Sequence, residues 1–455
     1  MRVAFHTFGC KVNQFDTEGL ISRFKAEGYE IVPFSAEADV YVINTCTVTK
    51  TAEQKARQVT RRIKRAHTGA LVVITGCYAQ TNPEDIAALP EADLIVGVSG
   101  RSNLVDLVNE QLRIRSKKEA EGCGFTRVLT GAQRTKVHSW TAKPGFEVYT
   151  PEFAEKTRAF LKIEDGCESY CSYCKIPFAR GPIRSLPPDQ VRAEIRRLKD
   201  SGFKELVLVG IHLGNYGKDL GKNLAELLGE VTEEHEETSA FRIRLSSIEP
   251  TDFTPELIRV VLGSDLFCPH FHIPLQSGSD TVLQRMNRPY STRDYRELLQ
   301  KLREYRPNLA VSTDLMVGFP GETEEEFTET LRFLREEKFS RVHIFPYSPR
   351  EGTKAAHLPN QLRRKEKEER ARRAEQTAEE VVGSYRQTFF GETVEVLTEE
   401  EVTPGVWEGF SGEYLRVRLL AGDGVGALQS NTLVRARVIK TDDEPLLAEM
   451  ELDTR

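Results

Sequence analysis

The sequence lacks the long apolar runs that mark membrane-spanning and secreted proteins. No stretch approaches the roughly 20 consecutive apolar residues that a bilayer-spanning helix needs. The first ten residues, MRVAFHTFGC, contain too short an apolar run for a secretory signal. We therefore expect a cytoplasmic protein without membrane association. Disulfides are rare in that reducing compartment, so the eight cysteines indicate metal binding or catalysis instead.

Nucleotide-binding fingerprints and histidine metal motifs are also missing. The segment GFPGET, residues 318–323, lacks the Lys-Ser/Thr ending of a Walker loop and the G-x-G-x-x-G order of a dinucleotide site. None of the nine histidines shows metal-ligand spacing. The net charge of −6 argues against one uniformly basic nucleic-acid surface, although it permits a local basic patch.

The first 115 residues alternate short apolar segments with polar, helix-like ones. The apolar segments are rich in β-branched and aromatic residues, which favours strands. They cover residues 2–8, 38–44, 70–76 and 92–98. Strands that alternate with helices predict a doubly wound parallel sheet in an α/β fold. Residues 116–156 are polar and contain several glycines and prolines, so they are interpreted as a connection.

The same alternation resumes from residue 157, which is consistent with the two or three domains expected of a 455-residue chain. Six strand candidates alternate with helices, and this pattern predicts a full or partial (β/α) barrel over residues 157–386 with its chemistry at the carboxyl ends of the strands. The strand candidates are 159–165, 205–211, 241–247, 270–276, 309–318 and 341–347. Residues 361–385 are expected to form a charged, solvated helix. Short strands after Gly391 predict a small all-β barrel over residues 387–455.

Cys167, Cys171 and Cys174 are candidate catalytic and metal-ligating residues. They form a C-x3-C-x2-C pattern directly after the first predicted barrel strand, where Gly166 eases the turn. Iron–sulfur clusters are held by cysteine thiolates, and three local cysteines leave one iron of a [4Fe–4S] cluster open, a site that S-adenosylmethionine could occupy. A zinc site completed by a distant residue, or simply packed cysteines, are the alternatives. Arg180 follows shortly after and could pair with a cofactor or substrate anion, or form a surface salt bridge.

Cys10, Cys46 and Cys77 each follow a predicted strand and precede a helix. Their spacings of 36 and 31 residues match one βα unit each. The carboxyl ends of parallel strands meet at one edge of a sheet, so we expect these three thiols to converge and to hold a second cluster. Accidental placement of buried cysteines is the alternative. Three neighbouring side chains are predicted to donate hydrogen bonds to the sulfurs: Asn44, Thr45 and Thr47.

Several stretches of the chain resemble the methylthiotransferase family of the radical S-adenosylmethionine superfamily. They are GCKVNQFDTE, INTCTV, TGCYAQ, DGCESYCSYCKIPFARG, IPLQSGSD and STDLMVGFPGET. The resemblance implies a methylthiotransferase domain at 1–115, a radical barrel at 157–386 and a TRAM domain at 387–455. It also implies two [4Fe–4S] clusters, with S-adenosylmethionine as both methyl donor and radical source. In the family, a methylthio group formed at the second cluster replaces a hydrogen on the substrate.

The resemblance and the barrel pattern together suggest five cofactor-binding residues. In the superfamily, the aromatic residue before the third cysteine, here Tyr173, packs near the adenine. A glycine loop after the second strand, here Gly210, lies near the methionine amine, although an ordinary βα turn is the alternative. Ser246, Gln276 and Asp314 are polar residues at or near the ends of later strands, where barrel active sites lie.

Charge patterns bear on the substrate. Residues 50–65 contain seven basic residues and one acid, and Arg57, Arg61 and Lys64 recur on one helical face. Such a stripe suits phosphate contacts, with a solvated helix face as the alternative. Residues 388–455 instead contain six basic and fourteen acidic residues, which would suit a basic protein partner.

The motif GCKVNQFDTE resembles the branch that acts on N6-threonylcarbamoyladenosine at position 37 of tRNA. The implied partner is the anticodon loop of ANN-decoding tRNAs, together with an electron donor and a sulfur source of unknown identity. The implied reaction is methylthiolation at C2 of the base. Alternatives are isopentenyladenosine 37, an aspartate of a ribosomal protein and, least favoured, a non-catalytic iron–sulfur protein that binds RNA.

Overall fold

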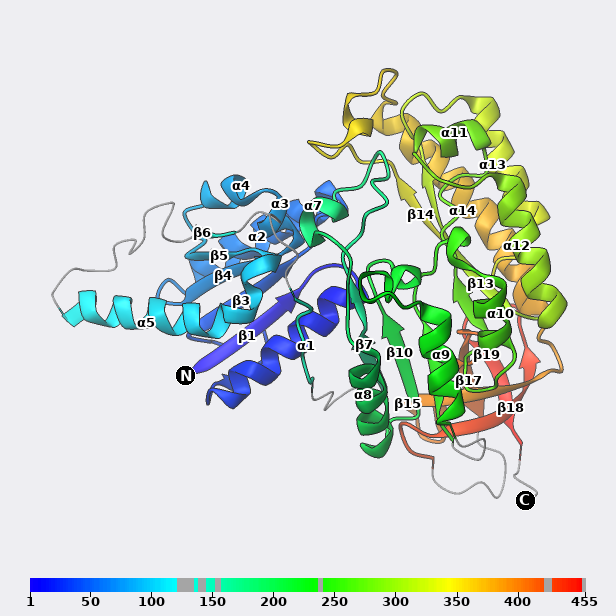
Figure 1. Ribbon diagram of the computed structural model, residues 1–455, viewed down its shortest axis with the longest axis horizontal. Helices are drawn as coiled ribbons and strands as arrows, with labels where there is room; N and C mark the ends of the chain where they lie inside the picture. Colours follow the sequence, from blue (N-terminus) through cyan, green and yellow to red (C-terminus); the bar gives the residue numbers. More distant parts are fainter. Residues whose placement is uncertain (121–134, 138–144, 152–156, 236–239, 421–427, 452–455) are drawn as a thin grey trace. The chain divides into compact units, whose positions relative to one another are not determined.

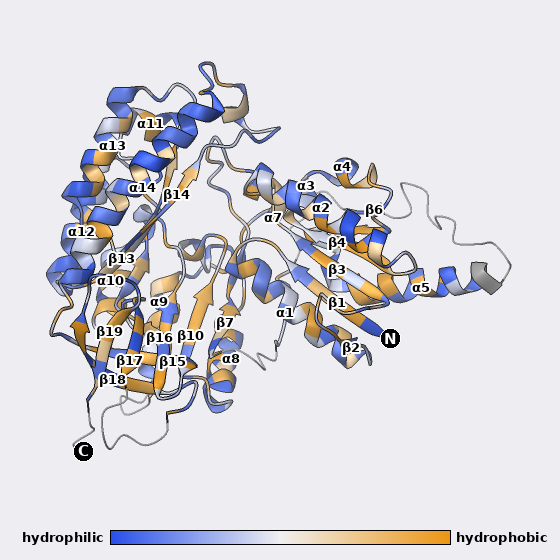
Figure 2. Cartoon of the chain, turned by 180° about the vertical axis from the view of Figure 1, so that it is seen from behind, coloured by the Kyte–Doolittle hydropathy of each residue, from blue (hydrophilic) through white to orange (hydrophobic). Residues whose placement is uncertain are grey.

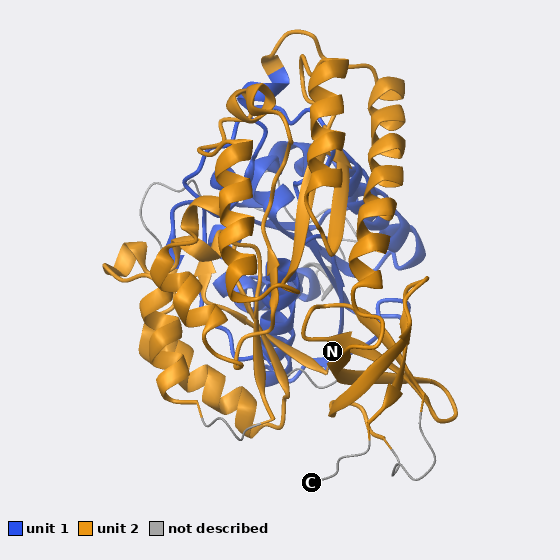
Figure 3. Cartoon of the chain, turned by 90° about the vertical axis from the view of Figure 1, so that its right-hand side faces the viewer, with its two compact units in different colours: residues 1–154, 165–184, 348–356 blue, residues 155–164, 185–347, 357–455 orange. Residues whose placement is uncertain are grey.

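The computed structural model describes residues 1–120, 135–137, 145–151, 157–235, 240–420 and 428–451. The chain divides into two compact units (Figure 3). The first unit contains residues 1–154, 165–184 and 348–356, and the second contains residues 155–164, 185–347 and 357–455. The first unit therefore includes the segment with Cys167, Cys171 and Cys174 as well as the N-terminal sheet. The domain boundaries expected from the sequence stay a prediction.

The first unit is built on a parallel sheet with strand order β2-β1-β3-β4-β5-β6 (Figure 1). Its strands are β1 (Arg2–Thr7), β2 (Glu30–Ile31), β3 (Val40–Thr45), β4 (Leu71–Gly76), β5 (Leu94–Val96) and β6 (Thr135–Lys136). Its helices are α1 (Lys11–Ala26), α2 (Lys50–Ala66), α3 (Cys77–Thr81), α4 (Pro83–Ala87), η1 (Val98–Asn103), α5 (Leu104–Ala120) and α7 (Ile176–Arg180).

Helices cover both faces of this sheet, as the sequence predicts. Successive strand residues point to opposite faces. Phe5 of β1 contacts Phe24 of α1, whereas its neighbour Ala4 belongs to a core cluster with Ile63 of α2. The sheet also extends into the predicted connection, because β6 pairs with β5. Most of that connection, including Cys123, lies outside the described residues.

The second unit contains six parallel strands that follow one another around a partial barrel. The order β7-β10-β11 continues into β12-β13-β14 through the bridge between Ser247 and His272. These strands are β7 (Arg158–Lys162), β10 (Glu205–Val209), β11 (Arg242–Leu245), β12 (His270–His272), β13 (Ala310–Val317) and β14 (Arg341–Pro346). The six predicted strands are confirmed. A short two-stranded sheet joins β8 (Glu164–Asp165) and β9 (Arg184–Ser185).

Helices cover the outside of this partial barrel, and Figure 2 shows their hydrophilic residues in blue around the orange strands. The helices of the second unit are α8 (Pro188–Asp200), η2 (Leu213–Asn215), η3 (Lys218–Leu220), α9 (Leu224–Glu233), η4 (Pro250–Asp252), α10 (Pro255–Leu262), α11 (Asp280–Arg285), α12 (Thr292–Tyr305), α13 (Glu324–Glu336) and α14 (Arg364–Gln387). The short helix η5 (Lys354–His357) belongs to the first unit except for its last residue. Capping boxes at Ser291 and Thr323 fix the starts of α12 and α13. Among the described residues, no helix combines the length and the apolar character needed to cross a membrane.

The C-terminal part of the second unit is a closed five-stranded barrel with order β15-β16-β17-β19-β18. Its strands are β15 (Thr393–Thr403), β16 (Val406–Ser411), β17 (Arg416–Leu420), β18 (Leu433–Lys440) and β19 (Leu446–Met450). The predicted all-β barrel is confirmed, although β16 and β19 escape the sequence pattern. Arg242 and Arg244 of β11 share Glu205 of β10 and also donate hydrogen bonds to backbone carbonyls of this barrel.

Candidate functional site

The structure brings Cys10, Cys46 and Cys77 together at one edge of the N-terminal sheet. Cys10 precedes α1, Cys46 follows β3, and Cys77 begins α3 directly after β4. The strands β1, β3 and β4 are adjacent and parallel, so their carboxyl ends lie side by side. A Cβ atom on Gly9 would lie 3.0 Å from Sγ of Cys46, which explains why glycine precedes Cys10.

The three thiols are close enough to affect one another electrostatically. Cys46 and Cys77 are buried, whereas Cys10 is exposed. Burial and the neighbouring charges of Cys77 and Cys10 raise the pKa of Cys46 to about 12. The backbone N–H of Val48 donates a hydrogen bond to Sγ of Cys46 at 3.4 Å. Iron binding to such thiols must displace their protons, since thiolates are the ligands.

The predicted hydrogen bonds from Asn44, Thr45 and Thr47 to the sulfurs are wrong. Asn44 Nδ2 donates to the carbonyl of Asn13 at 3.0 Å. Thr45 donates to the carbonyl of Thr75, and Thr47 donates to a carboxylate oxygen of Glu53. These side chains instead fix the loops that carry the cysteines.

Cys167, Cys171 and Cys174 lie in a turn-rich loop within the same compact unit, and all three are half-buried. Gly166 has a φ of +100°, and a Cβ atom there would lie 2.1 Å from the carbonyl oxygen of Pro182. Cys174 N donates to the Cys171 carbonyl at 3.0 Å. The N–H of Ile176 donates to Sγ of Cys174 at 3.4 Å. These contacts fix the backbone of the loop before and after the three cysteines.

Arg180 is fully buried and contacts both cysteine regions, so the surface salt bridge considered for it is wrong. Its Nε donates to Sγ of Cys77 at 3.3 Å. One Nη donates to Asp16 at 2.9 Å and to Asp165 at 3.1 Å, and the other donates to Asn13. Although burial disfavours the charge, Asp165, Cys77 and Asp16 raise the pKa of Arg180 well above its usual value. The guanidinium is therefore a permanent cation between the two regions.

Sequence reasoning missed Asn13 and Asp16, which complete this network. A signal exists, because Cys10, Asn13 and Asp16 are spaced by three residues across the start of α1. That spacing places Asn13 and Asp16 on one helical face, the face next to Cys10. Both side chains are buried. Asp16 also pairs with Arg101 at 2.9 Å.

The donor sets fit iron–sulfur clusters better than a single metal ion. In the described part of the chain, no three His, Cys, Asp or Glu side chains are placed to hold one ion. Each thiolate of a cubane binds a different iron, so cluster ligands lie farther apart than the ligands of one ion. The described cysteines are all free of disulfides. Two sets of three thiols, with N–H donors aimed at individual sulfurs, suit cluster binding.

Gly210 lies at the end of β10 in the second unit, where it makes room for Glu164. A Cβ atom on Gly210 would lie 2.7 Å from Oε2 of Glu164. The same oxygen accepts the N–H of His212 at 2.7 Å, and Glu164 is fully buried. Sequence reasoning missed Glu164, whose position at the end of the first barrel strand was its available signal. His212 in turn lies 2.6 Å from Asp252.

Ser246 and Gln276 come after strands β11 and β12 of the parallel barrel, and Asp314 lies within β13. Ser246 follows β11, and its buried Oγ has no hydrogen-bond partner among the described residues. Gln276 has a φ of +65°, which is unusual for a side chain with a Cβ atom, and its N–H donates to the Asp314 carbonyl. The Asp314 carboxylate lies 3.4 Å from Nε2 of His272. Tyr173 is half-buried in the first unit. The cofactor-binding roles of Tyr173, Ser246, Gln276 and Asp314 stay predictions.

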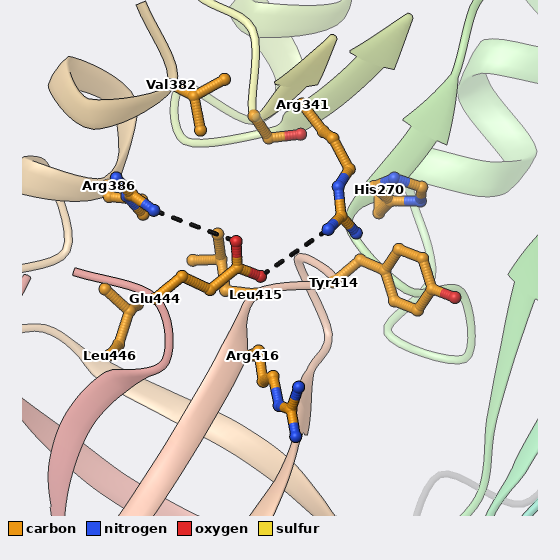
Figure 4. A pocket seen from close by; sticks show the side chains of 10 residues that line it. His270, Arg341, Val382, Arg386, Tyr414, Leu415, Arg416, Glu444 and Leu446 are labelled. Atoms are coloured by element: carbon orange, nitrogen blue, oxygen red, sulfur yellow. Dashed lines mark ion pairs between the residues drawn. The ribbon is translucent and has the colours of Figure 1, made fainter. Parts of the chain in front are cut away.

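A small pocket lies at the opposite ends of these strands (Figure 4). Its lining includes His270 and Arg341, the first residues of β12 and β14. Glu444 sits 3.9 Å from both Arg341 and Arg386. The pocket holds about 30 Å³, room for about one water molecule. It therefore belongs to the junction with the C-terminal barrel and not to the predicted active-site rim.

Of the stripe predicted on the basic helix α2, Arg61 is exposed, whereas Arg57 and Lys64 are partly buried and engaged by other residues. Arg57 donates to the Tyr78 hydroxyl at 2.5 Å, and Lys64 pairs with Asp93 at 2.8 Å. Its one acid, Glu53, is buried beside Arg350. The exposed basic residues of the helix after its first turn are Lys55, Arg61, Arg62 and Arg65. This exposed set is a patch of positive charge without an acidic residue from the same helix.

Comparison with known proteins places the fold and the site in one class. Residues 161–334 match the radical SAM superfamily, and residues 2–97 match the uncharacterized protein family UPF0004. The structure resembles the radical S-adenosylmethionine methyltransferase TsrM from Kitasatospora setae, solved with cobalamin and a [4Fe-4S] cluster, at a TM-score of 0.55 and 15% identity over 76% of each chain. The partial barrel thus has the fold of the radical SAM superfamily.

Relatives of known name define the family more closely. The chain is 42% identical to threonylcarbamoyladenosine tRNA methylthiotransferase MtaB of Bacillus subtilis, over 91% of this chain and 89% of that protein. It is 36% identical to the MtaB of Thermotoga maritima, over 94% and 93%. It is 32% identical to tRNA-2-methylthio-N(6)-dimethylallyladenosine synthase of Bacillus pumilus, over 96% and 84%. The chain belongs to the radical S-adenosylmethionine tRNA methylthiotransferase family, and it uses S-adenosylmethionine and iron–sulfur chemistry.

Proposed function

We propose that this protein methylthiolates C2 of N6-threonylcarbamoyladenosine at position 37 of tRNA. The relatives named for that nucleoside support this choice, since they reach 42% identity, against 34% for the dimethylallyladenosine synthase of Pelotomaculum thermopropionicum. The N-terminal motif GCKVNQFDTE favours the same branch. The observation that carries the proposal is the convergence of Cys10, Cys46 and Cys77 at one sheet edge.

Cys167, Cys171 and Cys174 would hold one [4Fe–4S] cluster, and Cys10, Cys46 and Cys77 would hold the other. Each set leaves one iron without a protein ligand. When bound and reduced, the first cluster supplies the electron that cleaves S-adenosylmethionine into methionine and a 5′-deoxyadenosyl radical. Gly166 and the local hydrogen bonds of its loop hold the first set of thiols in place.

Residues of the second unit would bind S-adenosylmethionine at the carboxyl ends of the barrel strands. The unpaired Oγ of Ser246 is a hydrogen-bond donor that a ligand would satisfy. Gln276 is held in a left-handed conformation by ladder bonds to β13, as residues at functional sites often are. Gly210 and Asp314 complete the proposed set of the second unit, and Tyr173 of the first unit stays a proposed contact of the adenine.

The tRNA would be bound through its anticodon loop, where a base can leave the stack and enter a pocket. The exposed arginines of α2 would contact the phosphate backbone. The favoured substrates are ANN-decoding tRNAs in the cytoplasm, with an electron donor and a sulfur source as further partners.

Reaction of the anaerobically reconstituted protein tests this proposal. The protein would be incubated with S-adenosylmethionine, a reductant, a sulfide source and tRNA that carries N6-threonylcarbamoyladenosine. Nucleoside mass spectrometry should detect the 2-methylthio derivative of that base. A product only on tRNA that carries isopentenyladenosine would assign the protein to the other branch.

A further inference from the structure

The contact between Arg180 and Cys77 joins elements that are distant in the sequence. Arg180 ends α7, the helix that follows Cys174, whereas Cys77 begins α3. Ala179 packs in a buried cluster with Cys77 and Val98. Both helices belong to the first unit, so the contact is internal to one compact body.

Acidic and amide partners fix the Arg180 guanidinium from two sides. Asp16 and Asn13 come from α1, which starts at the cysteine loop of Cys10, and Asp165 directly precedes Gly166 of the other cysteine loop. The Arg180 side chain has no exposed surface. With its Nη atoms held by these partners, the planar guanidinium directs its Nε–H at Sγ of Cys77, 3.3 Å away.

Charge and hydrogen bonds at the sulfurs are levers on the reduction potential of an iron–sulfur cluster. Reduction adds an electron, so a fixed cation that donates an N–H to a ligand sulfur stabilises the reduced state more than the oxidised state. A carboxylate beside the same sulfur would act in the opposite sense. Here the two nearby carboxylates are engaged with guanidinium groups, which leaves the N–H donor as the group that faces the thiol.

We propose that Arg180 is a positioning residue for the cluster at Cys10, Cys46 and Cys77. It orients the Cys77 sulfur and raises the reduction potential of that cluster. This inference rests on the proposed function, in which those three thiols hold a [4Fe–4S] cluster. It adds a residue from the other cysteine loop, so the segment that binds one cluster also sets the electronic properties of the other.

The test uses the full chain with Cys167, Cys171 and Cys174 replaced by alanine, so that the N-terminal set alone binds iron. In this parent, Arg180→Gln removes the positive charge and the guanidinium Nε–H that faces Cys77, and Arg180→Lys keeps the charge without that Nε–H. Arg101→Gln is the matched control, because Arg101 is equally buried and shares Asp16, but its other partner is Glu147 and not a thiol. Each protein is reconstituted anaerobically, its iron is counted, and its reduction potential is measured by titration with electron paramagnetic resonance.

We expect the parent to hold about four irons. Arg180→Gln should shift the potential to a more negative value, Arg180→Lys should shift it less, and Arg101→Gln should leave it unchanged. If Arg180→Gln loses the cluster while Arg101→Gln keeps it, the positioning role is also supported. Equal potentials in the parent and Arg180→Gln, or cluster loss in both glutamine variants, would overturn the proposal. A parent that binds no cluster would instead contradict the proposed function.

Discussion

The Arg180 guanidinium donates its Nε–H to Sγ of Cys77 across 103 residues of sequence. This contact connects the segment of Cys167, Cys171 and Cys174 with the sheet edge that carries Cys10, Cys46 and Cys77. The two sets of thiols therefore form parts of one compact unit. The proposed reaction assigns a cluster to each set of thiols, and each assignment can be tested separately.

Replacement of Cys77 should remove the N-terminal cluster and leave the other cluster in place. Cys77→Ala removes one ligand from the N-terminal set, so the iron content should fall from about eight to about four per chain. Formation of 5′-deoxyadenosine should continue, because Cys167, Cys171 and Cys174 remain, while methylthiolation should stop. Iron analysis and chromatography of the products measure these effects. Cys268→Ala is the control, since Cys268 is a buried cysteine of the second unit, and it should keep all the iron. Equal iron loss in both variants would count against the assignment.

Substitution by alanine should lower the stability of the protein at Gly210 and raise it at Gly229. In Gly210→Ala the new Cβ atom would lie 2.7 Å from Glu164, so we expect a loss of about 1–3 kcal/mol in stability and weaker binding of S-adenosylmethionine. In Gly229→Ala the methyl group meets open space on helix α9, so stability should rise by up to about 1 kcal/mol. Calorimetry of the apoprotein measures both. A stabilised Gly210→Ala would show that Glu164 does not need the space.

Stability at acidic pH should depend on Glu205. Burial alone would raise the pKa of Glu205. The neighbouring Arg244 and Arg242 nevertheless lower this pKa from 4.5 to about 2. Because the folded-state pKa is lowered, the stabilisation is present above pH 4.5 and is lost as the pH falls from about 4.5 to about 2. Glu205→Gln should cost about 3–5 kcal/mol at neutral pH and should flatten the decline in this window. Urea unfolding across the pH range measures this, with the exposed Glu395→Gln as control. If the free energy of unfolding of Glu205→Gln and that of the native protein fall in parallel between pH 4.5 and pH 2, the expectation is refuted.

The exposed arginines of α2 should contribute to tRNA binding through phosphate contacts. With Arg61, Arg62 and Arg65 replaced by alanine, binding should weaken and the salt dependence of log K should become shallower by about 2 units. Fluorescence anisotropy with labelled tRNA at several salt concentrations measures the slope. A triple variant of Arg293, Arg364 and Arg372 removes the same charge from surface ion pairs in the second unit. If both triple variants change the slope equally, the effect comes from net charge and not from α2.

Much of the fold is predictable from local sequence. The apolar strands alternate with helices at regular spacing, so the sheet and the six barrel strands follow from the pattern. The strand β19 does not, because its sequence LLAEM contains no β-branched or aromatic residue, and the five residues of helix α7 are too few to show a helical period. The C-x3-C-x2-C loop and the strand-end positions of Cys10, Cys46 and Cys77 are equally evident in the sequence.

Side-chain partners depend on tertiary contacts, and here the sequence is a poorer guide. Arg180 is a charged residue near a loop, and nothing local indicates that Asp16, Asp165 and Cys77 enclose it. The predicted stripe on α2 is exposed only at Arg61, because Arg57 is engaged by Tyr78 and Lys64 by Asp93. The position of Glu164 at the end of the first barrel strand is visible in the sequence, but its contact with the Gly210 loop depends on the tertiary structure.

The nucleoside profile of tRNA from cells that lack this protein tests the central claim most directly. Mass spectrometry should show N6-threonylcarbamoyladenosine without its 2-methylthio derivative. The derivative should return when the native gene is supplied but not when the Cys77→Ala gene is supplied. Persistence of the 2-methylthio derivative in cells that lack the protein would contradict the account.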